Sequence, residues 1–220
     1  MTTREQFLDQ LVSDNEGGIK PYSLLRATAL WLVLAWGFVV LATLWVQALR
    51  PGWFSQLLNH PQFAFETLSG LIAIVLLSLL VFRMGVPASR RRWLLVGTVV
   101  ATVVWISSFI VGLIYQPALE LSMMGKREFC RYETLVFALP PLILGMFYLH
   151  RAWVLNWTLS AFGLGALSAM LPAWLMQMAC MYDPAHILQA HIAPIIVVGL
   201  FGALIGVVVN NKRTKIKPNR

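Results

Sequence analysis

The chain has 220 residues, of which 59% are hydrophobic and only 12% carry a charged side chain. Because about a quarter of the residues of a typical soluble domain are charged, this composition excludes an ordinary soluble protein. Nine Trp, 15 Gly and 11 Pro are typical of a polytopic membrane protein, in which Gly and Pro are tolerated inside helices and Trp lies at the membrane interfaces.

The first 23 residues are polar and include four acidic side chains. They do not fit a cleavable signal peptide, which has a basic start and an apolar centre. The stretch TTREQFLDQLVSD predicts a short amphipathic helix, and its apolar face is formed by Phe7, Leu8, Leu11 and Val12. Because so short a helix is marginal alone in water, we expect this head to dock, either on the membrane surface or in a groove of a cytoplasmic partner.

Six apolar runs follow the head, and each is close to the roughly 20 residues that a helix needs to cross a membrane. They cover about 24–48, 65–82, 93–115, 134–150, 156–178 and 186–209. The sequence therefore predicts an all-α fold with a six-helix transmembrane bundle over residues 24–209 and a basic tail over residues 210–220. Small residues are spaced by four in the fifth and sixth runs and predict close helix packing; they are Ala161, Gly165, Ala169, Ala173, Gly202 and Gly206.

Lys and Arg in the loops indicate the orientation, because they collect on the cytoplasmic side of a membrane protein. Of the 17 basic residues, 13 fall on one side of the predicted bundle, and the other side has only Arg50, Lys126, Arg127 and Arg131. Both termini are therefore expected in the cytoplasm. Since this bias accounts for the net charge of +8, we expect contact with membrane lipid and no direct binding to nucleic acid.

Two cysteines, Cys130 and Cys180, lie at the outer ends of the fourth and fifth helices, within the phrases CRYE and CMYD. Antiparallel neighbouring helices place the two thiols at a similar depth, on the side that also carries His60, His186 and His191. A pair in contact could form a disulfide or bind a soft or borderline divalent metal together with His191 or His186. The alternative is that both cysteines are buried as small apolar side chains.

Catalytic motifs are missing from the sequence, which has no CxxC, HExxH or GxSxG, and we expect a protein that is not an enzyme. Glu66 is either an intramembrane polar group with a function or a side chain that reaches the interface. A small transporter, using Glu66 and His191, and a thiol-redox membrane protein remain as alternatives. The prolines at 140, 141, 172 and 194 are expected to bend or locally unwind their helices, and Asp183-Pro184 predicts the start of the sixth helix.

The arrangement resembles the negative regulator of sigma-F family, which are six-helix membrane anti-sigma factors of proteobacteria. The matching features are the short head, the entry residues Arg26, Ala27 and Trp31, the group Pro61, Phe63 and Glu66, the loop from Phe82 to Trp93, the two outer cysteines, and His191 with Pro194. Together they cover nearly the whole chain.

The resemblance implies that the head holds an extracytoplasmic-function sigma factor at the bacterial inner membrane. It implies that Cys130 and Cys180 are the sensor, and that a heavy metal or an oxidant acting on them releases the sigma factor. Some members of the family have His directly before a cysteine, where this chain has Phe129 and Ala179. A metal site here would therefore use His191, His186 or His60, and oxidation gains weight.

Overall fold

The computed structural model of the chain describes residues 23–84, 92–152 and 154–216. These residues form an all-helical bundle with no strand among them. Six helices are long and apolar enough to cross a membrane, which confirms the predicted six-helix membrane fold. The first five are α2 (Leu24–Val46), α4 (Pro61–Arg83), α5 (Arg92–Ile114), α6 (Cys130–His150) and α7 (Trp157–Ala179). The sixth is made of α8 (Pro184–His186), the π-helical turn η1 (Ile187–Ile192) and α9 (Ala193–Ile216).

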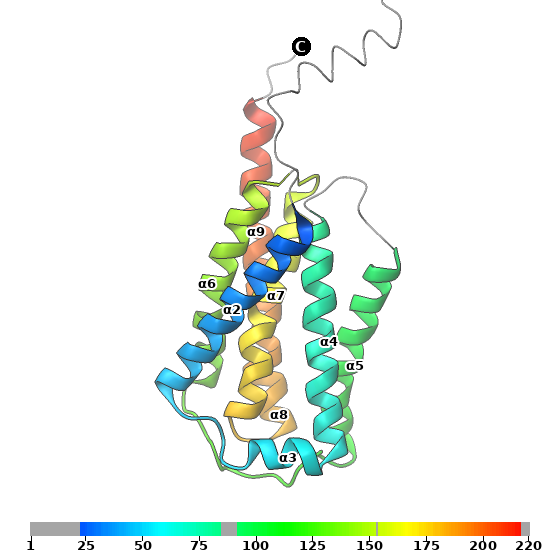
Figure 1. Cartoon of the computed structure of the whole chain (residues 1–220), viewed down its shortest axis with the longest axis vertical. Coiled ribbons are helices and arrows are strands. Elements are labelled where there is room, and N and C mark those ends of the chain that lie inside the picture. Colours follow the sequence, from blue (N-terminus) through cyan, green and yellow to red (C-terminus); the bar gives the residue numbers. More distant parts are fainter. Residues whose placement is uncertain (1–22, 85–91, 153, 217–220) are drawn as a thin grey trace, which may run out of the picture.

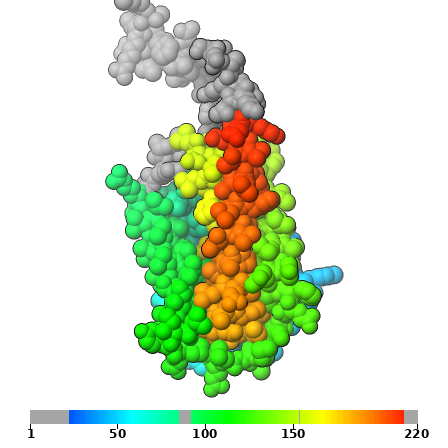
Figure 2. All heavy atoms as spheres, turned by 180° about the vertical axis from the view of Figure 1, so that it is seen from behind, coloured from blue at the N-terminus to red at the C-terminus, as the bar shows by residue number. Residues whose placement is uncertain are grey.

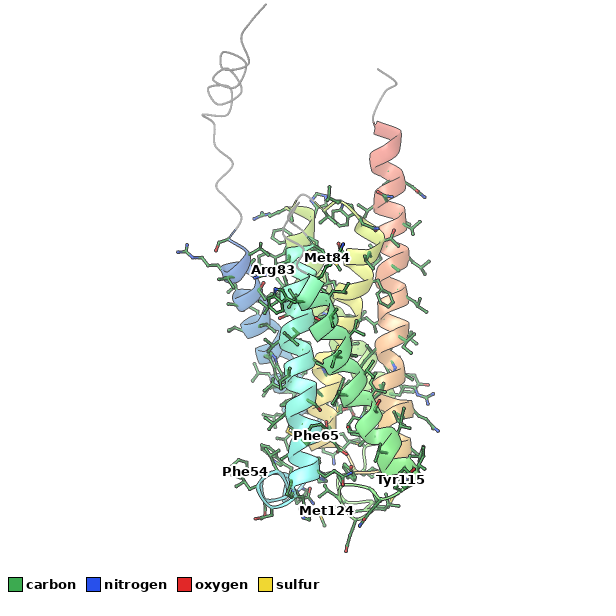
Figure 3. The ribbon with its side chains drawn as sticks, turned by 90° about the vertical axis from the view of Figure 1, so that its right-hand side faces the viewer. Phe54, Phe65, Arg83, Met84, Tyr115 and Met124 are labelled. Carbon is green, nitrogen blue, oxygen red and sulfur yellow. The ribbon has the colours of Figure 1, made fainter. Side chains whose placement is uncertain are left out.

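The six helices alternate in direction, so that α2 begins and α9 ends at the same end of the bundle (Figure 1). We call this the terminal end, and the opposite end, where α6 begins and α7 ends, the cysteine end. Figure 3 shows Arg83 and Met84 toward the terminal end, and Phe54, Tyr115 and Met124 at the cysteine end. A short helix that the sequence analysis did not predict, α3 (Trp53–Asn59), also lies at the cysteine end.

Several helix boundaries differ from the predicted runs. Helix α4 begins four residues earlier than predicted because Pro61 occupies its first turn, where a missing N–H costs nothing. Helix α6 also begins earlier, at Cys130, so this cysteine is the first residue of the span. Helix α9 continues to Ile216, into the predicted tail. Apart from Ser23, the predicted head with Phe7, Leu8, Leu11 and Val12 lies outside the described residues.

Helices α7 and α9 pack backbone against backbone along the predicted small-residue ladder. A Cβ atom added at Gly202 would collide with the carbonyl oxygen of Ala161, and one added at Gly165 would collide with that of Val198. At Gly206, an added Cβ would lie 2.6 Å from the Trp157 oxygen. The absence of a side chain at these three positions therefore permits the close approach. Figure 2 shows α9 crossing the back of the molecule between α5 and α6.

Helix α2 is held along a single narrow stripe. Its buried residues recur about every four positions, at Ala27, Thr28, Trp31, Ala35, Val39 and Thr43. Within this stripe, the Trp31 Nε1–H donates a hydrogen bond of 3.0 Å to the Pro141 carbonyl oxygen of α6. The carbonyl at Pro141 belongs to a proline pair that α6 accommodates without a break in the helix.

The prolines predicted to distort the helices differ in their effect. Helices α6 and α7 continue through Pro140, Pro141 and Pro172. The sixth span departs from α-helical geometry just before Pro194, where η1 has π-helical winding. In η1 the Ala193 N–H bonds the Leu188 carbonyl, five residues back. A proline leaves the carbonyl four residues earlier without its partner and clashes with it, and the wider turn relieves that conflict.

Candidate functional site

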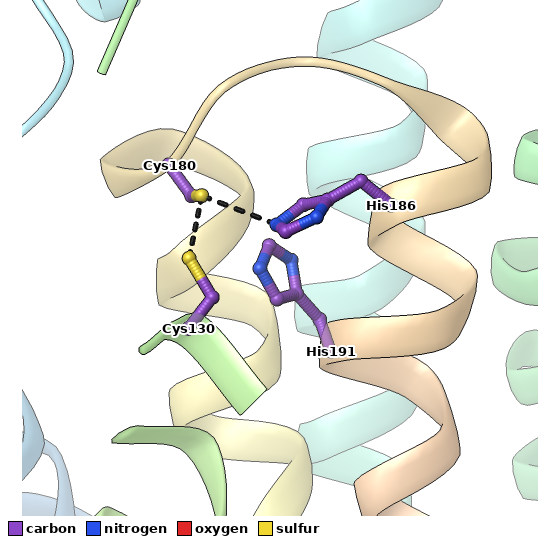
Figure 4. A group of neighbouring side chains, drawn as sticks. All are labelled: Cys130, Cys180, His186 and His191. Carbon is purple, nitrogen blue, oxygen red and sulfur yellow. Dashed lines mark hydrogen bonds between the residues drawn. The ribbon is translucent and has the colours of Figure 1, made fainter. Parts of the chain in front are cut away.

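Two cysteines and two histidines converge at the cysteine end (Figure 4). We call Cys130, Cys180, His186 and His191 the Cys–His centre. One ligand atom from each lies within 4.8 Å of those of the other three. The two Sγ atoms are 2.6 Å apart, and the Cys180 Sγ lies 3.3 Å from the His186 Nε2. The structure thus brings together four of the residues that the sequence analysis named as possible metal ligands, without His60.

The helix ends position the two thiols. Cys130 is the first residue of α6, where the Thr134 hydroxyl donates a hydrogen bond of 2.9 Å to its carbonyl oxygen. Cys180 is the residue that caps the C-terminus of α7, and its N–H bonds the Met176 carbonyl at 2.8 Å. The Arg50 guanidinium donates to the Cys180 carbonyl at 3.0 Å. Both cysteine backbones are therefore fixed, and both side chains are buried.

The π-helical turn aligns the two imidazoles. In an α-helix, residues five apart are separated by about 500°, so that their side chains point roughly 140° apart. A π-helical turn is wider, because residue i bonds to residue i+5, and it therefore brings residues five apart closer to the same face. His186 and His191 are five residues apart, one before η1 and one within it, and their rings meet edge to face at 5.1 Å between centroids. The Asp183 side chain fixes the start of the segment by accepting a hydrogen bond from the Ala185 N–H, as predicted.

His191 gives the strongest indication that this centre can bind a ligand. Its side chain is fully buried, yet neither ring nitrogen has a hydrogen-bond partner. A buried polar atom without a partner costs about 1–3 kcal/mol, and such atoms are rare in native structures. A metal ion bound by one ring nitrogen would give that nitrogen a partner, and the neighbouring side chains are themselves suitable ligands.

The donor set fits a tetrahedral ion of borderline or soft character. Two thiolates and two imidazoles form a standard closed site for zinc, and thiolates also favour cadmium and copper(I) over magnesium or calcium. A divalent ion that displaces the two thiol protons makes the site neutral overall, which suits a buried position. The residues present therefore fit such a metal, with Cys130, Cys180, His186 and His191 as its ligands.

The sulfur separation also allows a disulfide. In a tetrahedral zinc site with Zn–S distances of ~2.3 Å, the two sulfurs lie about 3.8 Å apart, whereas a disulfide bond is about 2.05 Å long. The observed 2.6 Å lies between these values.

The surroundings of Cys180 favour its thiolate form. The contact with Cys130, and then the imidazoles of His186 and His191, hold the pKa of the Cys180 thiol below its usual range against the effect of burial. A lowered thiol pKa favours both metal binding and oxidation.

A surface cavity reaches the centre. It has a volume of about 250 Å³ and is lined by Glu128, Cys130, Arg131, Tyr132, His186, Gln189 and Ala190. Two members of the Cys–His centre thus form part of its wall, while Cys180 and His191 lie fully buried. The cavity therefore connects Cys130 and His186 with the surface of the bundle.

Two buried arginines surround the centre, and the sequence analysis missed them because it used them only to determine orientation. The Arg127 guanidinium forms an ion pair of 2.8 Å with Glu133 and donates to the carbonyls of Thr43, Gln47 and Ala48. The Arg50 guanidinium lies over the rings of Phe63 and Tyr182, at 5.5 and 5.9 Å from their centroids. Burial lowers the pKa of Arg50.

Glu66 is fully buried among the helices, as the sixth residue of α4 counted from the cysteine end. Both of its carboxylate oxygens are 3.0 Å from the Tyr182 hydroxyl, which in turn accepts a hydrogen bond from the Ala118 N–H. Burial, followed by the Glu66 charge, raises the pKa of Tyr182. Glu66 and His191 belong to different clusters within the described part of the chain, and no hydrogen bond there joins them.

The other residues singled out in the sequence have separate places. His60 is exposed at the cysteine end and is not part of the Cys–His centre. The two Cys-x-Tyr-acid phrases are not equivalent, because Tyr132 is exposed whereas Tyr182 is buried. Their acids differ as well, since Glu133 pairs with Arg127 and Asp183 caps a helix.

Comparison with known proteins identifies the family. Searches of curated proteins and of solved structures each returned no significant match. The model of the family NrsF, negative regulator of sigma F, matches residues 12–210, which include all six membrane-spanning helices up to residue 210 and the whole Cys–His centre. The chain therefore belongs to the negative regulator of sigma F family, and it is a multi-pass membrane protein whose partner is a sigma factor.

Proposed function

We propose that the protein is an anti-sigma factor of the bacterial inner membrane with both termini in the cytoplasm. Its head, residues 1–23, holds an extracytoplasmic-function sigma factor through Phe7, Leu8, Leu11 and Val12. A soft or borderline metal ion, or an oxidant, reaches the Cys–His centre from the periplasm and releases the sigma factor. The protein catalyses no reaction.

One observation carries this proposal. The four side chains most suited to chemical sensing are gathered at the end of the bundle opposite to the start of α2, the helix that directly follows the head. Four of the 17 basic residues belong to the segments at the cysteine end, which supports a periplasmic position for this end. Sensing and sigma-factor binding would thus occur on opposite sides of one membrane.

Two signals have a chemical route at the centre. A divalent ion binds both sulfurs and both imidazoles and releases two protons. A two-electron oxidant takes two electrons from the thiols, which lose two protons and form a disulfide. Either product releases the sigma factor only if it stabilises the releasing arrangement more than the holding one.

The head is tested by purifying the full chain in detergent with a co-expressed sigma factor of the source organism, and comparing it with a chain that lacks residues 1–20. We expect the sigma factor to co-purify only with the intact head. A second variant, with Leu8 and Leu11 replaced by Asp, keeps the head but removes its apolar face and should also fail. Equal recovery with all three proteins would contradict the proposal.

The centre is tested by adding Cd²⁺ or the thiol oxidant diamide to the complex and measuring the released sigma factor. The double variant Cys130→Ser, Cys180→Ser should respond to neither reagent. His191→Gln should lose the Cd²⁺ response and keep the diamide response, because both thiols remain. His60→Gln is the matched control, since His60 lies at the same end outside the centre, and it should behave as the unaltered protein.

Metal binding is tested directly by titrating the reduced protein with Cd²⁺ and following the ultraviolet absorbance of the cadmium–thiolate bond. Loss of one ligand in His191→Gln should weaken binding at least about tenfold, the lower limit seen even for groups that only support a ligand. Unchanged affinity in this variant would exclude His191 from the site.

A further inference from the structure

Arg127 connects the Cys–His centre to helix α2. Its side chain is 1% exposed, and it joins parts of the chain about 80 residues apart. On one side its guanidinium donates to the Thr43, Gln47 and Ala48 carbonyls. On the other side its own carbonyl lies 3.5 Å from the Cys130 Sγ, which donates to it.

These contacts lie at the C-terminal end of α2, where Thr43 is in the last turn, Gln47 caps the helix and Ala48 follows it. The last carbonyl groups of a helix have no partner within the helix, and the C-terminus carries a partial negative charge that favours a cation. Arg127 supplies both the donors and the charge. Glu133, in the first turn of α6, holds the guanidinium in place with an ion pair of 2.8 Å.

A second arginine links the same end of α2 to the other cysteine. Arg50 follows α2 by four residues, and its N–H bonds the Met178 carbonyl at 3.2 Å. Its guanidinium bonds the Cys180 carbonyl at 3.0 Å and Gln56 at 2.8 Å. Each cysteine-bearing segment is therefore tied to the C-terminal end of α2 by one buried arginine.

Helix α2 is also packed in a way that allows it to move when these arginine contacts change. It is buried along one stripe, and the chain before Leu24 is the head. A displacement at its C-terminal end requires few buried contacts to rearrange, and α2 is the direct covalent connection between the cysteine end and the head.

We propose that Arg127, assisted by Arg50, is a positioning residue that holds α2 in the arrangement in which the head retains the sigma factor, and that a signal bound at the Cys–His centre loosens this hold. Cys130 follows Arg127 by three residues, and its Sγ contacts the Arg127 carbonyl oxygen at 3.5 Å, so a movement of this sulfur into a metal site or a disulfide displaces the segment that carries Arg127. The guanidinium then no longer fits the carbonyls of Thr43, Gln47 and Ala48. This inference rests on the proposed function for its biological meaning, but the coupling can be measured without the sigma factor.

The test compares the full-length chain with Arg127→Gln and Arg127→Lys. Arg127→Gln should release at least about fivefold more sigma factor without any signal, the lower range of allosteric coupling, and by reciprocity it should bind Cd²⁺ at least as tightly as the unaltered protein. Arg127→Lys should restore part of the retention, because Lys keeps the charge but cannot donate to three carbonyls and a carboxylate together. Arg50→Gln should shift release in the same direction.

Tyr182→Phe is the matched control. Tyr182 is buried next to Cys180, and the substitution removes its bonds to Glu66 and Ala118, neither of which belongs to α2. It should lower stability without raising the release of the sigma factor. If Tyr182→Phe and Arg127→Gln release the sigma factor equally, general destabilisation is the cause and the inference is wrong.

Hydrogen exchange of the backbone amides over residues 44–50 supplies the readout that needs no partner. Cd²⁺ should raise exchange there in the unaltered protein, and Arg127→Gln should exchange rapidly with or without Cd²⁺. If the unaltered protein retains no sigma factor, the proposed function fails while this measurement still tests the coupling. Exchange over residues 44–50 that is unaffected by Cd²⁺ and by Arg127→Gln would overturn the inference.

Discussion

Helices α7 and α2 both have 23 residues, but they play opposite roles in the bundle. In the most apolar part of α7, 72% of the residues are buried inside the protein, against 22% in α2. Helix α7 contacts α2, α4, α6, η1 and α9, whereas α2 offers its neighbours one stripe. This difference shows that two properties of a helix have separate effects. The hydrophobicity of its sequence determines that it lies in the membrane, whereas its small residues determine whether it packs at the centre of the bundle.

This contrast separates a rigid frame from a part that can move. Lipid provides no hydrophobic drive for one helix to prefer another, so packing and interhelical hydrogen bonds decide the arrangement. Helix α7 has the close packing, with α9 against its glycines. Helix α2 depends more on individual polar contacts, of which those from Arg127 and Trp31 are the clearest.

The largest effect is expected at the α7–α9 seam. Gly202→Val places a side chain against the Ala161 carbonyl of α7, and because a backbone cannot move aside as a flexible side chain can, the cost should exceed the roughly 3 kcal/mol usual for overpacking. We expect little or no monodisperse protein after purification in detergent. The matched control is Gly37→Val on α2, where an added Cβ meets nothing within 4 Å. Similar yields of the two variants would contradict the distinction between a rigid frame at α7 and α9 and a loosely packed α2.

A smaller effect is expected at the buried polar cluster beside α7. Tyr182→Phe removes the hydroxyl that joins Glu66 to the Ala118 N–H, and leaving these groups without a partner should cost about 1–3 kcal/mol. The midpoint of unfolding by sodium dodecyl sulfate would report the loss. The second substitution, Glu66→Gln, keeps a hydrogen-bonding group of the same shape at this position and should cost less. An equal or greater cost for Glu66→Gln would show that the carboxylate itself is required.

The smallest effect is expected within the stripe of α2. Trp31→Phe keeps most of the apolar ring but loses the hydrogen bond to the Pro141 carbonyl, a net loss of about 1 kcal/mol. The unfolding midpoint should fall slightly, and retention of the sigma factor should be less affected than in Arg127→Gln. Retention lost as fully as in Arg127→Gln would place the critical hold on α2 at Trp31 instead.

Much of the fold could be predicted from local patterns. The six spans follow from runs of apolar residues, because the membrane requires each crossing to be a helix of sufficient length. The seam between α7 and α9 follows from small residues spaced by four. The position of the cysteines at helix ends, together with the antiparallel order of the helices, placed Cys130 and Cys180 at a similar depth, and the structure brings them into contact.

The sequence by itself thus determined the membrane class, the number of helices and the end of the bundle at which both thiols lie, because each depends on residues near one another in the chain. Only the tertiary structure decided that His186 and His191 face the sulfurs, since this requires the π-helical turn. Only the tertiary structure also decided that Arg50 and Arg127 are buried residues that connect helices, and not exposed charges in loops. An arginine can be buried only where carbonyl and carboxylate groups accept its hydrogen bonds. Because these groups come from parts of the chain that are distant in sequence, no local sequence pattern predicts them.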